Sequence, residues 1–227
     1  MTGVQLATFT EELNGGDSIG ETLLFQLLNL AKGLVEQRRP WMDLRYTDVS
    51  KTVSASTNAW NTSIDISDIA RFSRFYGKHA VKVFDGTNRI DRYIQKPFNQ
   101  RLDYREAPFT FIHDVAGKKI YLNGSVSAGT LWLDHIKNSA DLANDTAEWI
   151  FPSWSHSILG FVAVGIHKGG IDYDEINARM APDNRAQADA IMSMLENRDN
   201  ELQLAAVEES DPSGRDEDGW RPNAINM

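Results

Sequence analysis

The sequence contains no cysteine among its 227 residues. This absence excludes a disulfide framework, a zinc site built on thiolates, an iron–sulfur cluster and a cysteine nucleophile. It is compatible with a reducing compartment.

The sequence also lacks an apolar stretch long enough to cross a membrane. The longest one, residues 158–166, is too short to span a bilayer. Residues 1–16 contain neither the basic nor the apolar region of a secretory signal. The sequence therefore predicts a soluble chain that is made in the cytoplasm and has no membrane partner.

Common motifs of phosphate and metal chemistry are missing as well. Gly160 and Gly165 are spaced as in a phosphate loop, but no lysine follows them. The five histidines never stand two or four residues apart, so no single helix or strand can present two of them together. We therefore expect no catalytic residue, no metal site and no cofactor.

One alternative would make the protein an enzyme. A metal-dependent hydrolase could take its ligands from two His–Asp pairs, His113 with Asp114 and Asp134 with His135. In such enzymes the ligands come from helices, whereas these pairs fall on predicted strands. Polar residues at strand ends are therefore the favoured interpretation.

Charge is distributed unevenly along the chain. Its formal net charge is −9. Residues 60–140 hold 12 basic and 8 acidic side chains, whereas the last 87 residues carry a net charge of −11. A chain polarised in this way can dock an acidic surface against a basic one, so we expect protein partners.

An amphipathic helix is predicted near the N-terminus. Asp17 or Ser18 can act as its N-cap, and Glu21 completes a capping box with Ser18. Apolar residues then recur at helical spacing to about Gln37, and Pro40 stops the helix.

Two further helices are predicted in the last third of the chain. A proline at position 152 opens an apolar helix of about four turns. Its small residues indicate a close neighbour: Ser157, Gly160, Ala163 and Gly165. A longer, charged helix begins at Asp172 or Asp174 and ends near residue 206, and Pro182 kinks or splits it.

Short runs of β-branched and aromatic residues, separated by turn signals, occupy the middle of the chain. We predict strands at residues 62–66, 80–84, 109–113, 119–122 and 130–136. Residues 41–61 are polar and are interpreted as a loop. Brief helical interruptions are expected near residues 68–75 and 99–105.

These elements predict an α+β fold, with a bundle of the N-terminal helix and the two C-terminal helices, an inserted small antiparallel β region and a flexible acidic C-terminal tail. Residues 1–206 would form one domain. Its parts are residues 1–40 (N-terminal helix region), 60–140 (β-rich insertion) and 150–206 (C-terminal helices). Residues 207–227 would form the tail.

A short basic segment is the candidate contact between subunits. Arg71, Arg74 and Lys78 surround two aromatic residues, Phe72 and Phe75. Basic residues interleaved with aromatic ones can bind nucleic acid, but the segment is short and the chain around it is acidic. We expect the two phenylalanines to pack beneath a basic rim that faces an acidic neighbour.

The C-terminal tail has the composition of a disordered segment, with proline, glycine and many acidic residues. A single tryptophan within it can anchor the tail on a partner. The candidate docking residues are Glu208, Asp211, Asp216, Asp218, Trp220 and Arg221.

The order of these parts resembles the head–tail connector, or adaptor, proteins of tailed bacteriophages. Three phrases carry the resemblance: Gly129-Thr-Leu-Trp-Leu133, Glu148-Trp-Ile-Phe-Pro152 and Asn197-Arg-Asp-Asn-Glu-Leu202. The resemblance covers residues 120–204 best, and the basic segment has no counterpart in it.

The resemblance implies a virion structural protein without enzymatic activity. Such adaptors form a ring, often a dodecamer, in the virion neck beneath the portal protein, and their C-terminal segments reach into the portal. They extend the channel towards a tail or stopper protein, so genomic DNA is only a passing cargo. A stopper or tail-completion protein would share these features and remains an alternative.

Overall fold

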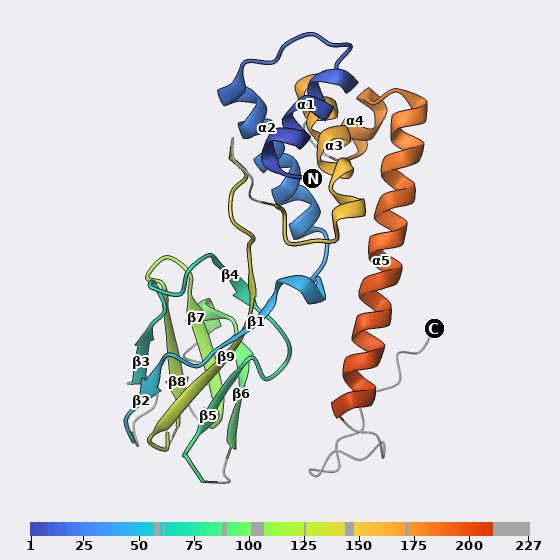
Figure 1. The fold of residues 1–227 in the computed structure, drawn as a ribbon. Coiled ribbons are helices and arrows are strands. Elements are labelled where there is room, and N and C mark those ends of the chain that lie inside the picture. The colour runs from blue at the N-terminus through green and yellow to red at the C-terminus, as the bar shows by residue number, and fades with distance from the viewer. Residues whose placement is uncertain are drawn as a thin grey trace. The chain divides into compact units, whose positions relative to one another are not determined.

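A computed structural model of the protein describes residues 1–56, 60, 62–87, 90–100, 107–124, 126–143, 148–170 and 173–210 (Figure 1). The chain forms two compact units. The helical unit comprises Met1–Gln37 and the described part of Asp141–Met227, and the β unit comprises Arg38–Ala140. Within the described residues, no helix is both long and apolar enough to cross a membrane.

The helical unit is built around one apolar helix. Its elements are α1 (Gly3–Leu13), α2 (Glu21–Gln37), the short 3-10 helix η3 (Ser153–Ser155), α3 (Ser157–His167), α4 (Tyr173–Arg179) and α5 (Pro182–Ser210). Helix α3 contacts α1, α2, α4 and α5, and all of residues 158–165 are buried. A helix that is apolar on every side must be covered on every side, which explains why four helices surround it.

Most helix boundaries follow local signals. Helix α2 ends at Gln37, as predicted. Pro182 splits the predicted long helix and occupies the first position of α5, where its missing N–H is not needed. Helix α1 was not predicted, and it begins with a capping box formed by Thr2 and Gln5.

Two glycines of α3 allow neighbouring helices to approach closely, as predicted from its small residues. A Cβ atom at Gly160 would lie 2.7 Å from the Phe9 ring of α1. At Gly165 it would lie 2.6 Å from Ile176 Cγ2 and 2.8 Å from the Ile176 carbonyl oxygen in α4. Gly33 of α2 differs, because a Cβ there would meet no other described element of the chain within 4 Å.

Alanine substitutions at Gly165 and Gly33 should have opposite effects. Gly165→Ala forces α4 away from α3 and should lower the free energy of unfolding by about 1–3 kcal/mol. Gly33→Ala meets no atom and should raise it by about 1 kcal/mol, because alanine is the better helix former. Urea denaturation followed by far-UV circular dichroism measures both, and a shift of both variants in the same direction would contradict the packing.

The β unit is a nine-stranded mixed sheet that curls around its own core (Figure 1). Its strands are β1 (Arg45–Asp48), β2 (Thr52–Val53), β3 (Thr62–Asp65), β4 (Phe72–Phe75), β5 (Val81–Phe84), β6 (Ile90–Lys96), β7 (Thr110–Asp114), β8 (Lys119–Asn123) and β9 (Gly129–Lys137). Two short 3-10 helices, η1 (Met42–Leu44) and η2 (Phe98–Gln100), accompany them.

Strand β9 organises the sheet because short strands pair with it in tandem on both edges. Strands β1 and β2 pair with one edge, and β4 and β5 pair with the other. The sheet continues from β5 through β6, β7 and β8 to β3, and among the described strands only β6 and β7 run parallel. Alternate residues point inward, and those of β9 on the core face include Leu131 and Leu133.

The predicted fold class is wrong, because the β region is neither small nor purely antiparallel and is a compact unit in its own right. Strands β1 and β2 lie in the segment interpreted as a loop, and β4 lies where a helical interruption was expected. Strand β6 was missed because its inward positions include the polar Asp91 beside Tyr93, which breaks the apolar alternation.

Candidate functional site

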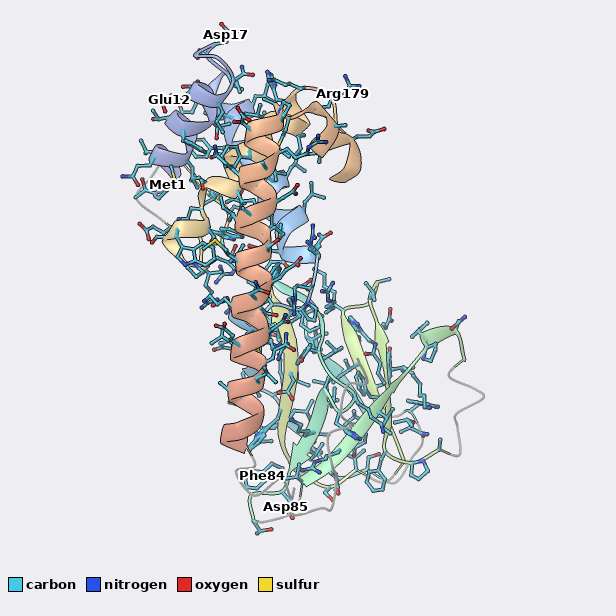
Figure 2. The ribbon with its side chains drawn as sticks, turned by 90° about the vertical axis from the view of Figure 1, so that its right-hand side faces the viewer. Met1, Glu12, Asp17, Phe84, Asp85 and Arg179 are labelled. Carbon is cyan, nitrogen blue, oxygen red and sulfur yellow. The ribbon has the colours of Figure 1, made fainter. Side chains whose placement is uncertain are left out.

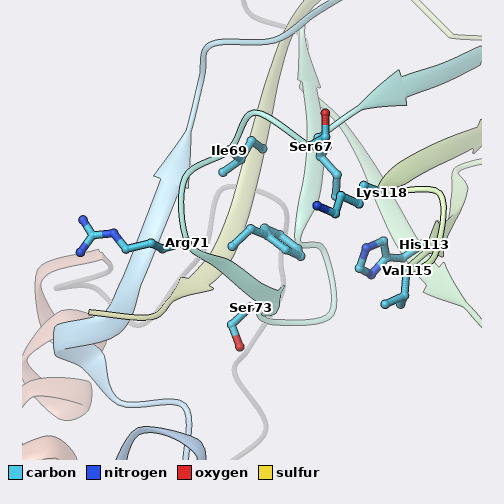
Figure 3. Close-up of a pocket in the computed structure, with 9 residues that line it drawn as sticks. Ser67, Ile69, Arg71, Ser73, His113, Val115 and Lys118 are labelled. Carbon is cyan, nitrogen blue, oxygen red and sulfur yellow. The ribbon is translucent and has the colours of Figure 1, made fainter. Parts of the chain in front are cut away.

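The β unit contains a cavity of about 330 Å³ beside β4 and the β7–β8 hairpin (Figure 3). Its lining combines apolar and aromatic side chains with two hydroxyls, two basic residues and an imidazole. The lining residues are Ile66, Ser67, Ile69, Arg71, Phe72, Ser73, His113, Val115 and Lys118. Segments about 40 residues apart in the sequence therefore meet at one site.

Two basic residues of the lining have unusual backbone conformations. Arg71 has a φ of 58° and Lys118 a φ of 49°, in the left-handed region that residues other than glycine seldom adopt. Their carbonyl groups accept backbone hydrogen bonds of 3.0 Å from Asn138 and Ile66, respectively. Such conformations cost on the order of 1 kcal/mol each and persist where the surrounding structure enforces them. The backbone therefore fixes the direction in which both basic side chains leave the chain.

An aromatic cluster adjoins the cavity. The Phe72 ring stacks on His135 at a centroid distance of 5.2 Å and meets His113 edge-on at 5.5 Å. Phe75 lies 5.1 Å from His113 and 5.2 Å from Phe111, also edge-on. Both phenylalanines pack against the core of the β unit.

The two histidines of this cluster differ in exposure. His135 is 1% exposed; its Nδ1 lies 2.9 Å from the Leu133 carbonyl and donates to it, and its Nε2 is buried without a partner among the described residues. His113 is half-buried, and burial lowers its pKa below the ordinary 6.5 while Asp114 opposes the shift. The imidazole that lines the cavity is therefore mainly uncharged at neutral pH.

The lining can bind a ligand but does not form a recognisable catalytic arrangement. Within the described residues, no hydrogen bond joins Ser67 or Ser73 to His113, and Ser67 instead donates to the carboxylate of Asp65. Aromatic and apolar walls with Arg71 and Lys118 among the lining residues suit a small apolar group that carries negative charge. Figure 3 shows the Arg71 side chain extending away from His113, whereas Lys118 lies beside the imidazole.

The four residues of the hydrolase alternative do not converge. The Phe72 ring contacts both His113 and His135 and so lies between them. In the part of the chain that the structure describes, no group of three or more histidine, cysteine, aspartate or glutamate side chains is placed to hold a metal ion.

The two aspartates of that alternative have structural partners. Asp134 accepts hydrogen bonds from Lys82 Nζ at 2.6 Å and from the Thr47 hydroxyl at 2.7 Å, which ties β5 and β1 to β9. Asp114 Oδ1 accepts the backbone N–H of Gly117 at 2.9 Å and closes the β7–β8 hairpin. Both carboxylates therefore stabilise the sheet.

No protein-family model and no curated protein matches this chain.

Charge is separated between the two units. The helical unit holds 7 basic and 22 acidic side chains, a formal charge of −15. The β unit holds 16 basic and 10 acidic side chains, a formal charge of +6. The unit boundaries separate charge more strongly than the sequence windows predicted.

The predicted basic segment lies on and beside β4. Arg71, Arg74 and Lys78 are exposed, and Arg71 also lines the cavity. Phe72 and Phe75 pack against the core of the β unit. That the three basic side chains form a rim above them stays a prediction. The acidic neighbour of this rim stays a prediction.

The predicted docking arm falls almost wholly outside the described residues. Glu208 belongs to α5. The others lie outside the description: Asp211, Asp216, Asp218, Trp220 and Arg221.

The sequence predicts individual residues of this site but not that they lie next to one another. Phe72 and His113 stood out separately, and no signal in the sequence places them in contact. The left-handed backbone at Arg71 and Lys118 was also unreadable, because neither residue is a glycine or an asparagine.

Proposed function

We propose that the protein is a head–tail connector of a tailed bacteriophage, which forms a ring between the portal and the tail in the virion neck. The observation that carries this proposal is the separation of charge, −15 on the helical unit and +6 on the β unit. Opposite charges on two parts of one chain favour contacts between unlike surfaces of neighbouring copies.

A ring needs that kind of contact. Closed rings form when one surface of each copy binds a different surface of the next, and identical surfaces would join copies only in pairs. The acidic unit of one copy meeting the basic unit of the next satisfies this requirement. An acidic channel surface would also let DNA pass without holding it, because phosphates and carboxylates repel each other.

Two of the phrases that carry the resemblance lie at central places of the fold. Gly129 to Leu133 belong to β9, on which four other strands pair. The phrase that ends at Pro152 leads into η3 and α3, around which the helical unit packs. Both phrases therefore lie at elements on which their own unit packs.

Reversing the charge of the basic segment tests the proposal. The variant Arg71→Glu/Arg74→Glu/Lys78→Glu brings the β unit from +6 to a formal charge of zero. We expect wild-type protein mixed with its portal protein to form rings in negative-stain micrographs and the variant to form none. The ring fraction of the wild type should also fall as salt is raised, because salt screens the attraction.

The matched control applies the same charge change to the helical unit, with Lys168→Glu/Arg179→Glu/Arg185→Glu at three exposed positions. This variant should still assemble. Assembly of both triple variants, or no ring from the wild type with portal, would refute the proposal. Deletion of residues 208–227 should leave the fold intact but abolish binding to the portal, since these residues are the proposed docking arm.

A further inference from the structure

The cavity of the β unit has the size and the walls of a small-molecule site. Its volume of about 330 Å³ lies within the range of about 300–1,000 Å³ that ligand pockets occupy. The apolar part of its lining comprises Ile66, Ile69 and Phe72, and the two isoleucines are buried. Because this volume is near the lower end of the range, the cavity suits a ligand with one ring rather than several.

One positive charge lies next to the imidazole of the cavity. Lys118 and Arg71 are the two basic residues of the lining. Figure 3 shows Lys118 beside His113, whereas the Arg71 side chain extends away from it. In the part of the chain that the structure describes, neither Lys118 nor Arg71 forms an ion pair. Lys118 therefore offers its positive charge to a ligand in the cavity.

The carboxylates that flank the lining residues in the sequence do not compete for this charge. They bind other groups: Asp65 the backbone N–H of Ser67, Asp68 the ammonium group of Lys51, and Asp114 the backbone N–H of Gly117. None of these three carboxylates is among the lining residues of the cavity. An anionic ligand that binds Lys118 therefore breaks no existing ion pair.

The backbone at Lys118 is a second sign that this side chain binds something. Four described residues other than glycine have a positive φ, and the two basic residues of the lining, Arg71 and Lys118, are among them. Lys118 has a φ of 49°, a conformation that glycine adopts without steric cost, yet the glycine of this hairpin loop, Gly117, stands one position earlier. Such strain is typical of ligand-binding sites, where a particular side chain is needed at a strained position.

The polar groups of the cavity suit a single negative charge. Burial lowers the pKa of His113, so this imidazole adds no second positive charge at neutral pH. The Ser67 hydroxyl already donates to Asp65. A phosphate dianion binds where several N–H donors converge, whereas a carboxylate can be held by one lysine ammonium group. The cavity therefore favours a carboxylate over a phosphate.

We propose that the cavity binds a small organic monoanion with one ring and one carboxylate. The ring packs against Phe72, Ile66 and Ile69, where burial of its apolar surface stabilises the complex. The carboxylate accepts a hydrogen bond from the ammonium group of Lys118, a charge-assisted contact that is weaker for a neutral ligand. This binding is a property of the single chain and does not depend on the proposed function.

Titration of the isotope-labelled full-length chain with phenylacetate, followed by two-dimensional NMR, tests the proposal. We expect saturable binding with a Kd of about 1 mM or tighter. Phenylacetamide has the ring without the charge, and acetate has the charge without the ring. Each should bind at least about tenfold more weakly than phenylacetate. Equal binding of either probe, or no response to phenylacetate, would overturn the proposal.

Replacing Lys118 tests the location of the site. Lys118→Gln should weaken phenylacetate binding by about tenfold or more, because the charged hydrogen-bond donor is lost. The matched control is Lys119→Gln, since Lys119 is the next residue, is also exposed and does not line the cavity. This control should bind phenylacetate as the wild type does. If both variants lose affinity equally, the general positive charge of the β unit attracts the probe and the assignment of the site is wrong.

Lys118→Gly separates the two roles of this position. The variant should lose phenylacetate binding as Lys118→Gln does, but its Tm should rise by about 2 °C because glycine relieves the strained backbone. Binding at the wild-type affinity, or a lower Tm that shows the lysine to be needed by the hairpin itself, would contradict the proposal. Formation of rings with the portal protein is a separate measurement, so failure of these tests would leave the proposed function standing.

Discussion

Trp149→Ala is expected to lower the free energy of unfolding of the helical unit by about 4–6 kcal/mol. Trp149 is 3% exposed, and its ring lies 4.3 Å from the Phe151 ring. Its Nε1–H donates a 2.8 Å hydrogen bond to Glu36 Oε1. The substitution therefore removes a large buried ring and takes a hydrogen-bond donor away from a buried carboxylate. Both losses lower the free energy of unfolding, and together they give the expected decrease of about 4–6 kcal/mol.

Urea denaturation followed by far-UV circular dichroism measures this effect. Trp154→Ala is the matched control, because Trp154 lies in η3 and is 42% exposed, so it should cost less than about 1 kcal/mol. Trp149→Phe keeps a ring but removes the donor and should cost about 1–3 kcal/mol. Equal losses for Trp149→Ala and Trp154→Ala would contradict this role.

Trp149 belongs to the phrase Glu148 to Pro152, which connects several helices of the helical unit. The residue before it, Glu148, is exposed and forms a bridge with Thr2 at the start of α1. Trp149 then reaches α2 through Glu36, and Phe151 accepts a 2.7 Å hydrogen bond from His156 Nε2 through its carbonyl. This short phrase therefore connects α1 and α2 to the beginning of α3.

The helices were predictable where local signals are strong. The proline at position 152 precedes η3 and Pro182 begins α5, as these local signals predict. The predicted capping box of Ser18 and Glu21 is wrong, because α2 begins at Glu21 and the Ser18 hydroxyl donates to Glu11 Oε1 instead. Helix α1 escaped because it buries only Gly3, Leu6 and Thr10, which is too weak an apolar stripe to recognise.

The missing strands are those that depend on distant partners. Arg45 of β1 pairs with Ile136 of β9, some 90 residues later, and Phe72 of β4 pairs with Lys137. Ladder hydrogen bonds to β9 stabilise these short strands, so their own sequences carry little alternation. The cavity could not be predicted for the same reason, because Phe72 and His113 in its lining come from different strands.

Phe72→Ala is expected to lower the free energy of unfolding by about 2–3 kcal/mol, since the ring is partly buried between two imidazoles. It should also weaken the dependence of stability on pH. In the wild type, burial holds the pKa of His113 below 6.5, the value in the unfolded chain. As the pH falls through 6.5, the unfolded chain binds a proton first, and the free energy of unfolding decreases.

Without the Phe72 ring, water reaches His113 and its pKa returns toward 6.5, so less stability is lost between about pH 7.5 and about pH 5. A residual loss should remain from His79, whose pKa is lowered by burial and then by Lys78. Asp65 and Asp68 also have lowered pKa values, but their ordinary value of 3.8 puts their effect at more acid pH.

Urea titrations across this range separate the two effects. Phe72→Leu is the control, because leucine still shields His113; it should cost about 1 kcal/mol and keep the wild-type dependence on pH. If Phe72→Ala loses as much stability on acidification as the wild type, the ring does not desolvate His113. The imidazole of the cavity would then be open to water already, and the cavity would lose the apolar character on which its choice of ligand depends.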